Sequence, residues 1–236
     1  MRLFYYPSNL KLNDHITFDQ SESKHITKVL RLSKGDHIHV TAGLGKAFKA
    51  EITDDHFNQC QAITIDQIAV APPNRPYFHL CVAPPKSKQR WEWLLEKTTE
   101  IGVDEITPVI CAKNERKSID LKRSQLMLIN ALKQSQQVQL PKLNAVSNFD
   151  NLVAQPTPDL KLIAHCDEDQ PHYQIDDFKT RFRHITIFIG PEGDFTEEEI
   201  QFALKNDYFA ISLGENRLRT ETAAIVAAQI VASIRK

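Results

Sequence analysis

Hydrophobic and polar residues alternate with a period of two through much of residues 36–70. Three such runs are separated by Gly43, Gly45 and Asn58, which are residue types that favour turns. Because side chains on a strand point alternately to its two faces, this pattern predicts a meander of antiparallel strands with one buried face. We expect these strands to form a small β-barrel.

A different spacing precedes these runs. Ile26, Val29 and Leu30 lie three or four residues apart, as on one face of a helix. Ser21 is placed to cap the amino end of this helix, and Gly35 follows its last turn. The sequence therefore predicts one short helix beside the barrel.

Three prolines within residues 71–77 interrupt both patterns. Proline lacks an amide hydrogen and has a fixed φ, so this segment fits neither a helix nor a central strand and predicts a linker. We expect a domain boundary there, with residues 1–72 in the barrel domain and residues 73–236 in a second domain.

Beyond the linker, apolar strand-like runs alternate with helical patterns. The helical patterns predict one helix over residues 89–101, ended by Gly102, and a longer one over residues 121–135. Apolar runs at residues 78–83, 105–110 and 160–166 predict buried strands. This alternation indicates an α/β domain with a mostly parallel sheet.

The last fifty residues twice repeat the order strand, glycine turn, helix. Thr196 and Glu199 have the spacing of a capping box and predict the start of the first of these helices. Parallel strands are expected to flank it as a βαβ crossover. The turns at residues 190–193 and at Gly214 would then lie at the carboxyl ends of parallel strands, where open α/β sheets hold ligands.

The composition, with 42% hydrophobic and 25% charged residues, is that of an ordinary globular protein. A formal net charge of -1 argues against indiscriminate binding to nucleic acid or anionic membrane, although a local basic patch is compatible with it. No apolar run reaches the length of a membrane span, and the first residues lack a signal-peptide pattern, so we expect a cytoplasmic protein with no membrane partner. Its widely spaced cysteines are expected to be buried reduced thiols: Cys60, Cys81, Cys111 and Cys166.

Arg217 and Arg219 lie immediately before the helix that Thr220 begins. Cations at the positive end of a helix are locally unfavourable, by roughly a few tenths of a kcal/mol each. Their placement points to an anionic group nearby. The alternative is a pair of solvent-facing arginines that form ion pairs with Glu215 or Glu221.

The segments GPEGDFTEEE from Gly190 and LRTETAA from Leu218 closely resemble the two carboxyl-terminal motifs of the RsmE family of SPOUT-superfamily methyltransferases. Residues 25–38 and 96–109 resemble two further blocks of that family, so the resemblance spans nearly the whole chain. Residues 215–217 differ: they read Glu-Asn-Arg where many relatives have Pro-Arg-Ile, which moves one arginine by one position.

The resemblance implies a fold that composition alone does not show. A PUA-like or OB-like β-barrel would precede an α/β domain whose carboxyl-terminal segment is threaded into a trefoil knot. The family methylates N3 of a specific uridine in 16S rRNA of the small ribosomal subunit, with S-adenosyl-L-methionine as cofactor. It also implies a homodimer.

The resemblance further implies where the cofactor and the uracil bind. Removing the N3 proton leaves negative charge on the uracil oxygens, so the site needs a base and a cationic or N–H donor. Arg219 is the expected donor and Glu221 the expected base, with Glu192 and His165 as alternative bases. The expected cofactor contacts are His165, Gly190, Pro191, Glu192, Gly193, Leu213, Gly214, Leu218, Arg219 and Thr220.

Basic residues of the predicted short helix are the expected RNA contacts. Lys24, Lys28, Arg31 and Lys34 repeat at three- or four-residue intervals and are expected to cluster on one helical face, with Lys86 extending the track. The alternative is a solvated charged face. His37 and His39 alternate on one strand, but no third ligand is apparent, so no metal site is expected.

Two other functions fit parts of the sequence. The chain is also compatible with a SPOUT enzyme that methylates a ribose 2′-hydroxyl, or with a non-catalytic RNA-binding protein of ribosome assembly. A nucleotide-dependent oxidoreductase fits the α/β pattern, but the chain lacks both the GxGxxG fingerprint and the acidic ribose partner.

Overall fold

The computed structural model describes residues 2–70, 75–156, 159–166, 173, 178 and 182–234. The chain divides into two compact units, of which the first holds Met1–Pro73 with Ile129–Leu140 and the second holds Asn74–Leu128 with Pro141–Lys236. The expected linker at residues 71–77 lies mostly outside the described residues, as does the boundary at residues 72 and 73, which therefore stays a prediction.

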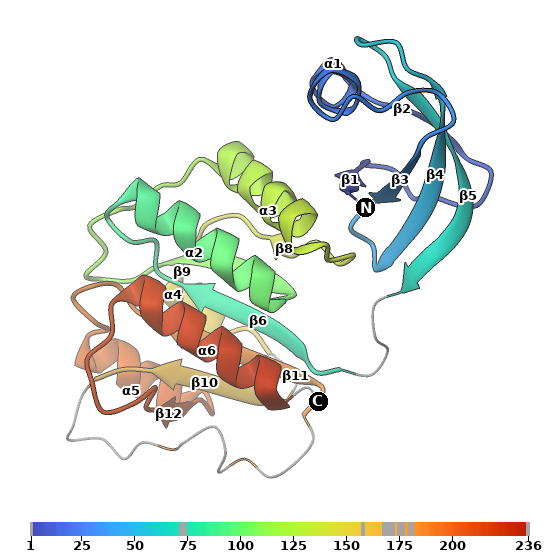
Figure 1. Cartoon of the computed structure of the whole chain (residues 1–236). Helices are drawn as coiled ribbons and strands as arrows, with labels where there is room; N and C mark the ends of the chain where they lie inside the picture. The colour runs from blue at the N-terminus through green and yellow to red at the C-terminus, as the bar shows by residue number, and fades with distance from the viewer. Residues whose placement is uncertain are drawn as a thin grey trace. The chain divides into compact units, whose positions relative to one another are not determined.

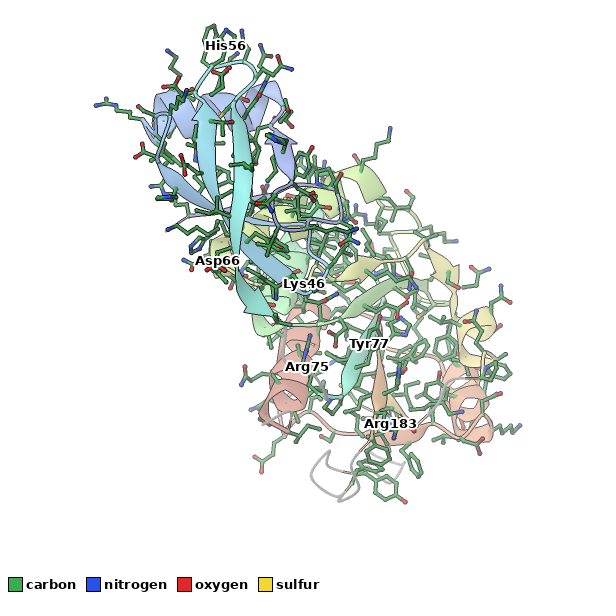
Figure 2. All side chains as sticks on the ribbon, turned by 90° about the vertical axis from the view of Figure 1, so that its right-hand side faces the viewer. Lys46, His56, Asp66, Arg75, Tyr77 and Arg183 are labelled. Carbon is green, nitrogen blue, oxygen red and sulfur yellow. The ribbon has the colours of Figure 1, made fainter. Side chains whose placement is uncertain are left out.

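The first unit is built on a five-stranded sheet in the order β1-β3-β4-β5-β2. Strands β3 (His37–Thr41), β4 (Lys46–Asp54) and β5 (Gln61–Val70) form the predicted antiparallel meander. Two short strands that the pattern did not predict flank it: β1 (Leu3–Tyr5), parallel to β3, and β2 (His15–Thr17), antiparallel to β5. Figure 2 shows the long β4–β5 hairpin with His56 at its turn. The small amino-terminal β domain is confirmed.

The short helix begins before the predicted residue. Asp19, and not Ser21, is the N-cap, because its carboxylate accepts a hydrogen bond from the backbone N–H of Glu22 at 2.8 Å. Helix α1 (Gln20–Lys24) continues into one π-helical stretch, η1 (His25–Val29). The helix therefore ends before it reaches Arg31 and Lys34, and the prediction of an N-cap at Ser21 was wrong.

A segment distant in sequence completes the first unit. Leu140 N donates to the carbonyl of Gly43 at 2.9 Å, and Gly45 N donates to the carbonyl of Val138 at 2.8 Å. The same segment contributes to a small hydrophobic cluster formed by Leu3, Ala47 and Leu132. The core of the first unit thus depends on residues 129–140 as well as on the strands.

The second unit is built on a seven-stranded sheet with the main order β12-β10-β11-β6-β7-β8. The described pairings are all parallel, which confirms the predicted α/β class. The strands are β6 (Tyr77–Val82), β7 (Glu105–Ile110), β8 (Lys142–Leu143), β9 (Ser147–Asn148), β10 (Leu160–Ala164), β11 (His184–Ile189) and β12 (Phe209–Ile211).

Helices cover both faces of this sheet (Figure 1). Helix α6 contacts α2 and strands β6 and β11, while α4 contacts α5 on the other face. Cys81 and Phe188 of the sheet share a core cluster with Phe149 of α4 and Ile200 of α5. The helices are α2 (Lys88–Ile101), α3 (Leu121–Ser135), α4 (Phe149–Val153), α5 (Glu197–Lys205) and α6 (Thr220–Ile234).

The helix ends follow the predicted local signals. Gly102 closes α2 in a left-handed conformation with φ 100°, where a side chain would be strained. Thr196 and Glu199 form the complete capping box at the start of α5. None of the described helices combines the length and the apolar character needed to cross a membrane.

Strands β11 and β12 flank α5, but β10 lies between them in the sheet. The chain after β11 therefore crosses over one strand before it re-enters the sheet. Strand order alone does not define how the following loop is threaded, so the trefoil knot implied by the family resemblance stays a prediction.

Candidate functional site

A cavity of about 420 Å³ lies beside the carboxyl ends of β10 and β12. Its size is within the range of roughly 300 to 1,000 Å³ that is typical of small-molecule sites. A smaller cavity, lined in part by Gly190, Pro191, Glu192 and Thr220, adjoins it. Both cavities are lined by Ala164, Cys166, Arg217, Leu218 and Ala223.

Asp194 holds the loop after β11 against the end of β10. Its N–H donates to the carbonyl of Pro191 at 2.9 Å, and its Oδ1 accepts from Phe195 N at 2.8 Å. The other carboxylate oxygen, Oδ2, accepts from Cys166 N at 2.9 Å. The loop therefore has a defined shape next to the cavities, with Asp194 in the left-handed region at φ 61°.

Two of the glycines in this loop pack closely against neighbouring side chains of the chain itself. A Cβ on Gly190 would lie 3.0 Å from Cε2 of Phe195, and a Cβ on Gly193 would lie 3.3 Å from the Lys113 side chain. Gly190 lines the smaller cavity, whereas Gly193 lines neither. Packing within the chain thus accounts for the close contacts at both positions.

Gly214 differs from these two glycines. It has φ 133°, a conformation that side chains rarely adopt, and it lines the larger cavity. No atom of the described residues lies within 4 Å of the position that a Cβ would take. A side chain at Gly214 would therefore be strained and would add volume at the cavity wall.

Thr220 links the two loops. Its buried hydroxyl donates to the carbonyl of Gly190 at 2.9 Å, which fixes the first residue of α6 to the end of β11. Pro191 and Leu218 line the smaller cavity on either side of this bond, and Leu213 lines the larger one. The two sequence motifs therefore meet at one place.

The two arginines before α6 lie differently. Both are exposed, but Arg217 lines both cavities and Arg219 lines neither. Glu192 lines the smaller cavity and accepts a hydrogen bond from Lys86 N at 3.1 Å. The structure thus brings to the cavities the arginine whose position departs from the family pattern, and the role predicted for Arg219 stays a prediction.

Glu221 and His165, both considered as bases, are buried in different surroundings. Glu221 has a side chain 7% exposed, and its Oε1 lies 3.5 Å from Nε of Arg90. Its other oxygen is buried and has no hydrogen-bond partner among the described residues. His165 lines the larger cavity, which Glu221 does not.

The cysteine prediction was correct at three positions and wrong at one. Cys60, Cys81 and Cys111 are buried free thiols, but Cys166 is exposed. Cys166 lies two residues beyond the end of β10, outside the sheet, and forms part of the cavity wall. Partial burial and the Asp194 carboxylate raise the pKa of its thiol.

The predicted basic helical face does not form as expected. Lys24 and Lys28 are exposed within α1 and η1, whereas Arg31 has φ 57° and, like Lys34, lies beyond the helix end. The four side chains therefore cannot share one face of a helix. Lys86 lies in the second unit, and its Nζ is 2.6 Å from Oε2 of Glu115.

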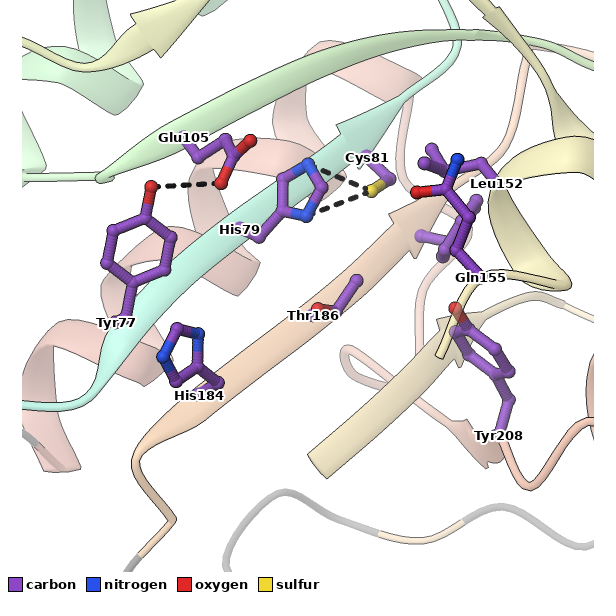
Figure 3. Close-up of a pocket in the computed structure, with 10 residues that line it drawn as sticks. Tyr77, His79, Cys81, Glu105, Leu152, Gln155, His184, Thr186 and Tyr208 are labelled. Carbon is purple, nitrogen blue, oxygen red and sulfur yellow. Dashed lines mark hydrogen bonds between the residues drawn. The ribbon is translucent and has the colours of Figure 1, made fainter. Parts of the chain in front are cut away.

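A second polar cavity, of about 320 Å³, lies on the sheet face toward the amino ends of β6, β7 and β11 (Figure 3). Tyr77 Oη donates to Glu105 Oε2 at 2.9 Å, and Glu105 Oε1 accepts from Lys142 Nζ at 2.9 Å and from Asn144 Nδ2 at 2.6 Å. His79 Nε2 lies 2.6 Å from Thr107 Oγ1. This network was not predicted, although His79 and Glu105 stand out as polar residues in apolar strands.

Burial and hydrogen bonding shift the pKa values of this network. Burial acts to raise the pKa of Glu105, but hydrogen bonds from Asn144, Lys142 and Tyr77 outweigh it and lower the pKa from 4.5 to about 2. Burial lowers the pKa of His79 and raises the pKa of Cys81 well above its ordinary value. Within the described residues, no group of three or more His, Cys, Asp or Glu side chains is arranged to hold a metal ion.

Comparison with known proteins identifies the family. Residues 72–232 match the model of a family described as RNA methyltransferase domain, and residues 18–65 match one described as RNA methyltransferase PUA domain. Ribosomal RNA small subunit methyltransferase E of Rickettsia conorii is 30% identical over 226 residues, which cover 94% of this chain and 91% of that protein. The chain belongs to the ribosomal RNA small subunit methyltransferase E family. The resemblance inferred from its motifs is confirmed.

Two solved structures resemble this member of the methyltransferase E family over almost its whole length. A probable rRNA-methyltransferase from Porphyromonas gingivalis has a TM-score of 0.90 and 34% identity, covering 100% of this chain and 98% of that one. Ribosomal RNA small subunit methyltransferase E from Neisseria gonorrhoeae was solved bound to S-adenosyl methionine. It has a TM-score of 0.87 and 27% identity, covering 99% of this chain and 98% of that one.

Proposed function

We propose that the chain transfers the methyl group of S-adenosyl-L-methionine to N3 of a uridine in 16S rRNA of the small ribosomal subunit. The observation that carries this proposal is the pair of adjoining cavities formed where the two carboxyl-terminal family motifs meet. The methyltransferase E of Neisseria gonorrhoeae, similar along almost the whole chain, binds the same cofactor.

The residues around the cavities fit such a cofactor. Pro191, Leu213 and Leu218 offer apolar contacts, and the open space beside Gly214 leaves room for a ligand. The Glu192 and Glu215 carboxylates and the Arg217 guanidinium offer partners for the amino and carboxylate groups of the methionine moiety. Bound there, S-adenosyl-L-methionine would supply an electrophilic methyl group, and positioning would supply most of the catalysis. The proposed cofactor contacts remain His165, residues 190–193, 213 and 214, and 218–220.

The substrate uracil must lose its N3 proton, and negative charge then spreads onto its ring oxygens. We assign Arg219 as the group that stabilises this charge and Glu221 as the base. Arg217 is a second candidate for the first role and His165 for the second, because both line the larger cavity. Arg90 would hold the Glu221 carboxylate in place.

The proposal extends to the protein's surroundings. Lys24, Lys28, Arg31, Lys34 and Lys86, all exposed, would contact the rRNA. The functional unit would be a cytoplasmic homodimer with a knotted cofactor segment, as the family resemblance implies.

Mass-spectrometric mapping of rRNA tests the proposal. Small ribosomal subunits are incubated with S-adenosyl-L-methionine and either the wild-type protein or the variants Arg219→Ala, Arg217→Ala and Glu221→Gln, with Arg183→Ala as a surface control. N3-methyluridine at one position, formed by the wild type and the control, is the expected product. Ribose 2′-O-methylation would indicate the other enzyme class. Binding of RNA without any methylation would indicate an assembly protein.

A further inference from the structure

Positive charge is concentrated in two short segments of the second unit. Residues 86–92 and 115–124 together hold seven lysines and arginines and three acidic residues, although the whole chain has a formal net charge of -1. We call the surface formed by these two segments the basic face. Its excess of cations is therefore a local feature and not a property of the composition.

The structure brings the two segments together. Trp91 Nε1 donates to Ser124 Oγ at 3.0 Å, and Arg123 Nη2 lies 3.2 Å from Glu92 Oε2. These contacts hold the first turn of α2 beside the first turn of α3. Basic residues that are about 30 positions apart in sequence thus form one surface.

The cations of the basic face outnumber the carboxylates available to them. The pKa of Glu92 is lowered by the hydrogen bond from Arg123 and by the charges of Arg123, Lys88 and Arg116, so three cations converge on one carboxylate. Nη1 of Arg116 is buried with no hydrogen-bond partner among the described residues. Lys88, Lys117 and Lys122 are exposed. The face therefore has cationic groups left over for a ligand.

Local electrostatics make this arrangement unfavourable in isolation. Asp120 caps α3, since its Oδ1 accepts from Arg123 N at 3.0 Å, but the first turns of α2 and α3 hold basic and no acidic residues, and the positive end of a helix disfavours basic side chains. Like charges on one surface also repel each other. A bound polyanion would offset both costs, since it supplies several negative charges at once.

The basic face adjoins the cofactor cavities. Lys86 N donates to Oε1 of Glu192, which lines the smaller cavity, and Asn114 Nδ2 donates to the carbonyl of Pro84 at 3.4 Å. The first segment therefore begins at the edge of the proposed site. A chain of phosphates bound on the basic face would pass close to the reacting atoms.

We infer that the basic face binds backbone phosphates of the RNA substrate and leads the RNA to the cavity lined by Glu192. This inference rests on the proposed function, because it takes the polyanion to be the RNA that is methylated. Neutralising two cations of the face should remove about two phosphate contacts. Each lost contact lowers the slope of log affinity against log salt by roughly 0.7 to 0.9.

The test compares two matched double variants of the full chain. Lys88→Gln with Lys122→Gln removes two charges from the basic face, and Arg183→Gln with Lys205→Gln removes two exposed charges elsewhere. Binding to small ribosomal subunits and to protein-free small-subunit rRNA is measured across a salt series, and S-adenosyl-L-methionine affinity is measured by calorimetry. The basic-face variant should bind both RNA samples roughly tenfold more weakly at low salt, with a slope reduced by about 1.4 to 1.8 and unchanged cofactor affinity.

Other results overturn the inference in distinguishable ways. Equal slopes in the two double variants would mean that the face makes no specific phosphate contact. Loss of binding to subunits but not to protein-free rRNA would assign the face to an acidic protein partner. If the wild type bound neither sample, the proposed function would fail as well.

Discussion

Polar side chains at the two edges of the parallel sheet are used differently. Toward the amino ends of β6 and β7, Glu105 accepts hydrogen bonds from Tyr77, Lys142 and Asn144 (Figure 3). At the carboxyl ends, Arg217 and Glu192 line cavities, and Gly214 leaves open space. At the first edge the chain itself supplies the partners of the Glu105 carboxylate, although a cavity of about 320 Å³ adjoins it, whereas the second edge presents side chains to a ligand.

Strongly shifted pKa values often mark functional sites, but several of those in this chain belong to the Glu105 network and its neighbours. Hydrogen bonds lower the pKa of Glu105 against the effect of burial, whereas burial lowers the pKa of His79 and raises the pKa of Cys81. Glu105 already accepts three donors, so its shift reflects stabilisation of the fold. Because a cavity also lies beside Glu105, the more informative signs of a site are a glycine with open space beside it and a convergence of sequence motifs.

Replacing Glu105 is expected to have the largest effect on stability. Glu105→Gln would leave the part-buried Tyr77 and Asn144 donors and the exposed Lys142 ammonium without an ionised acceptor, and should lower the free energy of unfolding by about 3 kcal/mol, measured by urea denaturation near neutral pH. Cofactor affinity should not change. Glu100→Gln is the control, since the Glu100 carboxylate is more exposed than that of Glu105 and its ion pair with Lys97 should contribute much less to stability. Equal losses of stability in Glu105→Gln and Glu100→Gln would contradict a stabilising role for the hydrogen bonds at the amino edge of the sheet.

The pH dependence of stability sharpens this prediction. The folded-state pKa of Glu105 lies below its ordinary value of 4.5, so the unfolded state binds the proton more readily. The contribution of the Glu105 carboxylate to the free energy of unfolding should be complete above pH 4.5 and should disappear as the pH falls toward 2. The difference in the free energy of unfolding between the wild type and Glu105→Gln should become smaller over that pH range. A difference that stays constant with pH would exclude a role for the ionised carboxylate.

Filling the space beside Gly214 is expected to have the largest effect on binding. Gly214→Val should lower S-adenosyl-L-methionine affinity by about a hundredfold, or roughly 2.7 kcal/mol, measured by calorimetry. Gly35→Val is a matched control, because Gly35 also has a positive φ of 90° with no atom near its Cβ position. Both variants should lose about 1 to 3 kcal/mol of stability from backbone strain. Unchanged cofactor affinity in Gly214→Val would place the cofactor elsewhere.

Removing the link between the two loops should have an intermediate effect. Thr220→Val deletes the hydroxyl that donates to the Gly190 carbonyl and should cost about 1 to 2 kcal/mol of stability. Cofactor affinity should fall a few-fold because α6 is less firmly fixed to β11. Thr220→Ser keeps the hydroxyl and should restore affinity, measured by the same calorimetry. A serine variant that binds as poorly as the valine variant would argue against the hydrogen bond.

Cysteine labelling should give the smallest effect and compares the two cavities directly. Cys166 is exposed in the wall of the larger cofactor cavity, whereas Cys81 is buried beside the cavity of the Glu105 network. At pH 8, iodoacetamide should modify Cys166 and leave Cys81 unmodified, and bound S-adenosyl-L-methionine should slow the modification of Cys166 several-fold, as followed by mass spectrometry. A Cys166→Ser variant identifies the labelled site. Labelling of Cys166 at the same rate with and without cofactor would count against its place in the cavity wall.

Local signals in the sequence predicted helix ends well. Gly102 and the Thr196–Glu199 capping box act within a few residues, so their effect can be read from the sequence. The N-cap at Asp19 was missed because Ser21 is an equally good cap by type, and only the geometry of the chain distinguishes them. The two-residue strands β8 and β9 are too short to show any alternation.

The candidate site was predictable in place but not in detail. The motifs located both loops, yet residue type alone could not show that Phe195 packs against Gly190 or that Arg217 lines the cavities. The Glu105 network joins residues from β6, β7 and the segment after β8, so no local pattern indicates it. The domain limits and the roles assigned to individual site residues remain predictions.

The contribution of residues 129–140 to the first unit has a consequence for modularity. A fragment that stops at residue 73 would lack Leu132 and the partners of Gly43 and Gly45, so Leu3 and Ala47 would face water. The small β domain is therefore not an independent module that can be expressed as one continuous fragment and fused to another enzyme. A recombination event that keeps this domain intact must transfer the coding regions of residues 1–73 and 129–140 together. Because the second region is inserted in the sequence of the second unit, the two units are inherited together.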